Sequence, residues 1–197
     1  RYTRKRIMKK IFILVIVVLT LGCAAAGVPH TNDPEKRLEF AYQLMNTPGR
    51  GIAAERLGLQ SLSEFEAAGN VYGEAEAHTF LGLFYKSSAY REHKDFYVSH
   101  GEYDPTSEKS ISHFKEAEKA FEKDGDYWGV SKVIFAMGNA FASEKDMKNA
   151  CSSYKESLDI YRSDKNVFIG RVHPHNPNFG SYEEMVESFI QLQCGGV

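Results

Sequence analysis

The sequence lacks the short motifs that mark most metal sites and most nucleophilic enzymes. Its seven histidines form no HExxH motif, and its three cysteines form no Cys-x-x-Cys pair. No Gly-x-Ser-x-Gly turn and no glycine-rich phosphate loop is present. His93 and His100 share one predicted loop and His173 and His175 share another, but neither set has the spacing of a metal site. We therefore expect no enzymatic activity, no cofactor and no bound metal.

Basic residues are scarce outside the first part of the chain. Six of the 24 Lys and Arg residues lie in residues 1–22, a stretch without acid, so the remainder has 18 basic and 26 acidic residues and a net charge of −8 with His neutral. Nucleic-acid binding needs a basic face that displaces counterions from phosphates. An acidic body of this kind argues against a DNA- or RNA-binding role.

An apolar run over residues 11–21, interrupted only by Thr20, follows the basic start. Eleven residues at about 1.5 Å each cover only about half of a bilayer core of ~30 Å, so a stable transmembrane helix is not expected. The order of basic residues, short apolar run and small residues at 24–26 is typical of an export signal. Met8 is a natural start for such a signal, and we expect residues 1–7 to lie upstream of the protein.

The end of this signal, Leu-Thr-Leu-Gly-Cys at residues 19–23, resembles the lipobox of bacterial lipoproteins. In that family a signal peptidase cleaves before a cysteine that has been diacylated. Gly22 and Cys23 match the family's pattern, whereas Thr20 stands where leucine is usual. The alternative is a plain secretory signal cleaved among residues 24–26, which would remove Cys23.

The lipobox resemblance implies a lipoprotein of the bacterial cell envelope. Residues 1–22 would be its signal peptide, and residues 23–33 would be a lipidated cysteine followed by a short polar tether. Acyl chains of the palmitate type on Cys23 contribute ~0.8 kcal/mol per buried methylene, so two or three of them anchor a protein firmly. Ala24 after the cysteine is similar to signals that send lipoproteins to the outer membrane, facing the periplasm.

From residue 34 onward the apolar residues follow a helical period. Pro34 suits the first position of a helix, and Gly69 followed by Asn70 is a typical helix end. Helices are predicted over residues 34–46, 51–68, 72–88, 107–124, 127–143, 147–162 and 182–193. Short loops between them predict antiparallel neighbours in one all-α domain, residues 34–197.

Two segments of this domain align without a gap, from Ser61 to Gly82 and from Ala117 to Gly138. This repeat resembles the tetratricopeptide family. The matching residues are Leu81, Gly82, Tyr85, Ser110, Phe114 and Ala117 in one unit and Met137, Gly138, Phe141, Ala150, Tyr154 and Ser157 in the next. The resemblance implies antiparallel helix pairs stacked as a short superhelix of about two or three repeats. Residues 182–193 would form a capping helix.

The same resemblance implies a partner-binding groove lined by the first helix of each unit. The residues at the family's groove positions are Glu76, Thr79, Leu83, Lys86, Lys132, Phe135, Asn139 and Ala142. Asn139 carries an amide that can bond the backbone of an extended ligand. We therefore expect an adaptor or scaffold that binds another envelope protein or peptide, similar in layout to the lipoproteins that act as pilotins for secretion machines.

An insertion of about 16 residues at 89–106 lies inside the earlier unit, between its two helices. It contains the aromatic residues Phe96, Tyr97 and Tyr103. One interpretation is a segment that folds over a helix end and buries these rings. The other is a loop site for a small molecule or glycan, which would make the chain an accessory protein of envelope metabolism.

Cys151 and Cys194 are the cysteines that remain if Cys23 is lipidated. An even pair in an oxidising periplasm is readily bridged, and such a bridge would pin the capping helix to the last repeat. The alternative is two unpaired thiols that lie too far apart.

Overall fold

The structure, a computed structural model, describes residues 30–171, 173 and 176–195. In this part of the chain every regular element is a helix. The helices are α2 (Pro34–Met45), α3 (Gly51–Ala68), α4 (Val71–Lys86), α5 (Ser88–Glu92), α6 (Lys94–Ser99), α7 (Glu108–Asp124), α8 (Tyr127–Ser143), α9 (Met147–Arg162) and α10 (Tyr182–Cys194). Each predicted helix boundary lies within two residues of the observed one.

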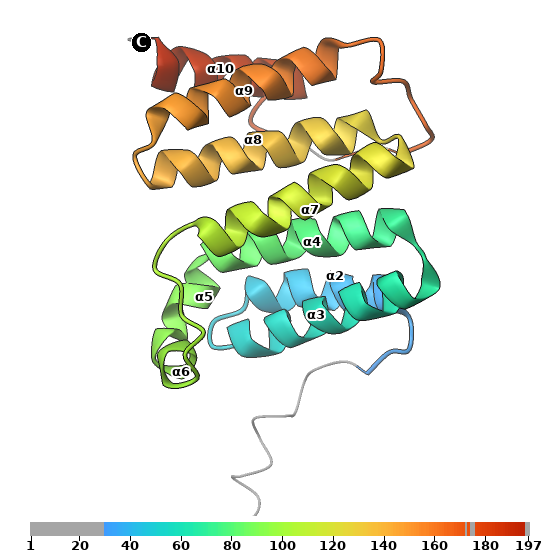
Figure 1. Cartoon of the computed structure of the whole chain (residues 1–197), viewed down its shortest axis with the longest axis vertical. Helices are drawn as coiled ribbons and strands as arrows, with labels where there is room; N and C mark the ends of the chain where they lie inside the picture. Colours follow the sequence, from blue (N-terminus) through green and yellow to red (C-terminus); the bar gives the residue numbers. More distant parts are fainter. Residues whose placement is uncertain (1–29, 172, 174–175, 196–197) are drawn as a thin grey trace, which may run out of the picture. The chain divides into compact units, whose positions relative to one another are not determined.

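Successive long helices pack against one another as antiparallel neighbours (Figure 1). α2 packs on α3, α3 on α4, α4 on α7, α7 on α8, α8 on α9 and α9 on α10. The chain divides into two units, and these helices all belong to the second, Thr31–Val197. The expected all-α stack of antiparallel helix pairs with a C-terminal capping helix is confirmed.

Local capping explains where the helices of this stack begin and end. The side chains of Asn70, Asp126 and Asp146 each accept a hydrogen bond from the backbone N–H three residues later. Gly69 and Gly125, with φ of 64° and 81°, end α3 and α7 in the left-handed conformation that glycine adopts without steric cost. The two inter-repeat turns therefore have the same construction.

Each of the two matching helix pairs is in close contact through one glycine. A Cβ atom on Gly82 of α4 would lie 2.5 Å from the ring of Phe114 on α7, and one on Gly138 of α8 would lie 2.5 Å from the ring of Tyr154 on α9. Both rings are fully buried. The aligned Gly-aromatic pairs thus occupy equivalent places, and the absence of a side chain at glycine is what admits the ring.

The insertion at 89–106 is not an irregular loop, because it contains the short helices α5 and α6. Tyr90 and Tyr97 are buried there against the ends of α3 and α4. The hydroxyls of Tyr85 and Tyr97 donate hydrogen bonds of 2.6 and 2.7 Å to the two carboxylate oxygens of Glu55 on α3. The burial of Tyr90 and Tyr97 agrees with the first interpretation, in which the segment folds over a helix end and buries its aromatic rings.

The capping helix α10 covers the last helix pair. Tyr182, Met185 and Val186 are buried in a cluster with Tyr154 and Leu158 of α9. Cys151 and Cys194 form a disulfide with a Cα–Cα distance of 5.8 Å, which joins the start of α9 to the end of α10.

None of the helices in the described part of the chain is both long enough and apolar enough to cross a bilayer. The expected signal peptide of residues 1–22, the lipidation site Cys23 and the tether up to residue 29 lie outside the described residues.

Candidate binding groove

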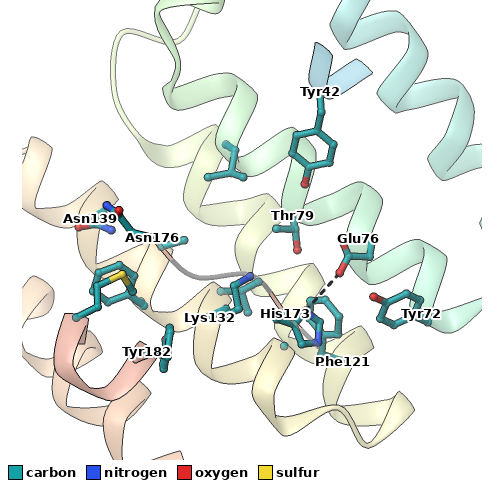
Figure 2. A pocket seen from close by; sticks show the side chains of 16 residues that line it. Tyr42, Tyr72, Glu76, Thr79, Phe121, Lys132, Asn139, His173, Asn176 and Tyr182 are labelled. Atoms are coloured by element: carbon teal, nitrogen blue, oxygen red, sulfur yellow. Dashed lines mark ion pairs between the residues drawn. The ribbon is translucent and has the colours of Figure 1, made fainter. Parts of the chain in front are cut away.

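A cavity of about 560 Å³ lies between α4 and α8 (Figure 2). We call it the α4–α8 groove. It is lined by Tyr42, Tyr72, Glu76, Thr79, Leu83, Phe121, Gly129, Lys132, Val133, Phe135, Ala136, Asn139, His173, Asn176, Tyr182 and Met185. The size and the mixture of apolar walls with a few polar groups are typical of ligand sites.

Six of the eight predicted groove residues line this cavity, three from each helix. They are Glu76, Thr79 and Leu83 of α4 and Lys132, Phe135 and Asn139 of α8. Lys86 and Ala142, the other two predicted groove residues, do not line this cavity. Each lies at the C-terminal end of its helix: Lys86 is the last residue of α4, and Ala142 packs against the cluster around Tyr154.

Charge inside the groove is mixed and partly buried. Burial lowers the pKa of Lys132, although Glu76 and Asp126 act in the opposite direction. Burial, followed by the negative charge of Glu76, raises the pKa of both Tyr42 and Tyr72. The groove therefore presents one carboxylate and one ammonium group beside neutral phenols.

The amide of Asn139 is already engaged on one side. Its Oδ1 accepts a hydrogen bond of 2.9 Å from the hydroxyl of Tyr154. Burial raises the pKa of this hydroxyl to about 12, so it stays protonated and remains a donor. Asn139 can therefore serve a ligand as a donor through Nδ2, which matches a peptide carbonyl.

His173 is the main element of the groove that the sequence analysis did not identify. Its side chain is 7% exposed, and its Nε2 lies 2.6 Å from Oδ2 of Asp126, the residue that caps α8. Burial acts to raise the pKa of Asp126, but the hydrogen bonds to His173 and to the N–H of Gly129 outweigh it and lower this pKa. His173 Nδ1 also lies 3.9 Å from Glu76, the pair drawn as a dashed line in Figure 2.

Arg171, two residues before His173, also holds this connecting segment in place. Its guanidinium lies 3.8 Å from the ring centre of Tyr72 and forms an ion pair with Asp124 at the end of α7. Together with His173, it attaches the connection between α9 and α10 to the groove's edge. The sequence of this connection has no helical or strand period from which its contacts with α4 and α8 could be inferred.

The floor of the groove at α10 is formed by Tyr182. Its hydroxyl lies 2.7 Å from Oγ of Ser157 and donates to the backbone oxygen of Ser131 at 3.0 Å. Burial raises the pKa of Tyr182 to about 12, although its hydrogen bonds to the two serines lower it. This network holds the capping helix against the small residues of α8 and α9.

The three residues of the predicted loop site do not form a common surface. Tyr97 is fully buried, so it cannot contact a ligand, and this part of the prediction was wrong. Phe96 is 38% exposed and packs against Tyr97 and His100. Tyr103 stacks on Tyr90 at a ring distance of 5.5 Å. The physical reason is the carboxylate of Glu55, which draws the hydroxyl of Tyr97 inward.

Within the described residues, no group of three or more His, Cys, Asp or Glu side chains is placed to hold a metal ion. His78 and His113 approach each other through their Nδ1 atoms at 3.0 Å without a third ligand of this kind. No family model matches the chain, and neither a curated protein nor a solved structure is detectably similar to it.

Proposed function

We propose that the chain is a membrane-anchored adaptor of the bacterial envelope, whose α4–α8 groove binds an extended peptide segment of another envelope protein. The observation that carries the proposal is that residues at equivalent repeat positions of α4 and α8, such as Glu76 and Lys132, line one cavity. Repeat proteins of this kind use surfaces built from successive repeats to bind partners. The resemblance to tetratricopeptide repeats supports the same use.

The chemistry of the groove suits a peptide better than a small anion or a sugar. Leu83, at 36% exposed, and Phe135 offer apolar contact for a side chain. Nδ2 of Asn139 can donate to a backbone carbonyl. Glu76 can pair with a positive charge of the ligand, and Lys132 can pair with a negative one. A segment with alternating apolar and polar side chains meets each of these groups.

The anchor of the proposed adaptor is Cys23, and residues 23–33 are its tether. The support for this is the lipobox resemblance at residues 19–23. We propose an outer-membrane lipoprotein that faces the periplasm and acts as an assembly factor, in the manner of pilotins, without catalysis, metal or cofactor.

The alternative function, glycan or small-molecule binding through residues 89–106, receives no specific support. Tyr97 is held inside by Glu55, and Tyr103 is stacked on Tyr90. The remaining exposed ring, Phe96, lines an open depression with Leu59 of α3, and neither Tyr97 nor Tyr103 lines it.

The test is a pull-down from native bacterial membranes with the full chain, followed by mass spectrometry. Two groove variants are compared with the wild type: Leu83→Arg, which fills the cavity from a partly exposed position, and the double variant Lys132→Ala, Asn139→Ala. We expect a defined envelope protein that copurifies with the wild type and is lost with both variants.

Lys86→Ala is the matched control, because Lys86 lies on the same helix but outside the cavity. Thermal unfolding of each variant shows whether the fold persists. A partner that is retained by Leu83→Arg, or lost equally with Lys86→Ala while all variants stay folded, would show that the groove is not the binding site.

A further inference from the structure

The connection between α9 and α10 carries an apolar tip that projects into solvent. Val167, Phe168 and Ile169 are 62%, 75% and 40% exposed. Isolated exposed apolar residues are common on protein surfaces, but three in succession with a phenyl ring at the centre are not. Such a tip is favourable only where it leaves water.

The base of this tip is fixed to the helical stack on both sides. Nδ2 of Asn166 donates to the backbone oxygen of Tyr161 at 2.7 Å, and Lys165 lies 5.3 Å from the ring centre of Tyr127 at the start of α8. On the other side, Arg171 contacts Tyr72 at the start of α4. The tip therefore projects from the side of the helical stack on which α9 ends and α4 and α8 begin, and we call this side the tip-bearing end.

The chain enters the helical stack at this same end. α3 runs antiparallel to α2 and ends at the turn that begins α4, so the start of α2 lies beside the end of α3. Arg37 near the start of α2 joins the two, because its guanidinium contacts the backbone oxygen of Thr31 at 2.9 Å and the carboxylate of Glu64 at 2.8 Å. Figure 1 shows the start of α2 and the connection after α9 on one side of the helical stack.

The chain length between Cys23 and Pro34 limits how far this end can stand from an anchor. Eleven residues span at most about 36–40 Å when fully extended at ~3.3–3.6 Å each. A chain anchored through Cys23 therefore keeps Pro34, at the start of α2, within this distance of the bilayer.

We propose that the Val167–Phe168–Ile169 tip inserts into the membrane interface as a second contact beside the lipid anchor. This inference rests on the proposed anchor, not on the proposed groove. Because the chain beyond residue 22 is acidic and the tip is apolar, the contact is with the acyl boundary of zwitterionic lipid, and it is insensitive to salt. Two contacts at one end would hold the helices upright on the membrane.

The test uses the full chain, purified in its processed form and reconstituted into phosphatidylcholine vesicles with brominated acyl chains, which quench tryptophan fluorescence. Phe168→Trp places a reporter in the tip. The wild type supplies the background from Trp128. Leu192→Trp is the matched control, since Leu192 is 81% exposed but lies at the opposite end, beside the Cys151–Cys194 disulfide.

We expect the added fluorescence of Phe168→Trp to shift to the blue and to be quenched in these vesicles at low and at high salt, while that of Leu192→Trp is not quenched. Vesicle flotation of the same samples reports the anchor separately. Flotation without quenching of Phe168→Trp would overturn the tip and leave the anchor. Failure to float would overturn both.

A blue shift of Phe168→Trp that appears without vesicles and grows with protein concentration would also overturn the proposal. It would mean that a second copy of the chain covers the tip.

Discussion

At the scale of single residues, Gly82 is the position where one added methyl group has the clearest consequence. Its Cβ would lie 2.5 Å from a ring carbon of Phe114, which is fully buried and cannot turn aside. We expect Gly82→Ala to lower the free energy of unfolding by about 1–3 kcal/mol, because overpacking outweighs the helix propensity of alanine. Urea unfolding followed by circular dichroism measures this change.

The double variant Gly82→Ala, Phe114→Leu checks the cause. Leucine at 114 removes the ring that the methyl group meets, so Gly82→Ala should cost less in this background than in the wild type. An equal cost in both backgrounds would assign the loss to something other than the ring.

His113 gives the stability of the protein a defined pH dependence. Burial, together with the neighbouring His78 and Lys109, lowers the pKa of His113 from 6.5 to about 4, although Glu116 acts in the opposite direction. The folded protein therefore binds fewer protons than the unfolded chain between these two values, so its stability falls as the pH falls from 6.5 toward 4.

Replacing His113 by glutamine removes this proton-binding difference while retaining a polar side chain. We expect the free energy of unfolding of His113→Gln to change less between pH 6.5 and pH 4 than that of the wild type. Urea unfolding at a series of pH values provides the comparison. Identical pH profiles would exclude His113 as the source of the acid sensitivity.

At the scale of whole elements, one covalent bond adds to the packing that holds α10. The disulfide closes a loop with a sequence separation of 43 residues and joins α10 to α9. We expect loss of the disulfide in Cys151→Ser, Cys194→Ser to lower the free energy of unfolding by about 2–4 kcal/mol. A reducing agent should have the same effect on the wild type in urea unfolding and no effect on the double variant, whereas sensitivity of the double variant would point to another cause.

Helix limits were predictable because the signals that set them are local. Asn70 and Asp126 cap the helices that follow them, and Gly69 and Gly125 end the helices before them. The two helices of the insertion were not predictable in this way. With five and six residues each, they are too short to show a period, and they depend on contacts such as that of Tyr97 with Glu55, which lies 42 residues away.

The groove was predictable where its lining residues occupy equivalent positions of the two repeats. Glu76 and Lys132 lie at equivalent positions of two aligned segments, so a pattern in the sequence identifies both. His173 has no counterpart in another repeat. Its place opposite Asp126 depends on how the connection after α9 returns across the stack, and this is a tertiary contact across 47 residues.

At the scale of the whole molecule, the order of packing decides how a mechanical load would be carried. α2 packs chiefly on α3 and α4, whereas α9 and α10, the last helices of the stack, are joined by the Cys151–Cys194 bond. If the lipid anchor holds the chain before Pro34, a pull on a partner in the groove is transmitted through α4 and α3 to α2 and then to the tether. α2 would peel away first, so the groove would lose Tyr42 while its walls on α4 and α8 stay assembled under tension.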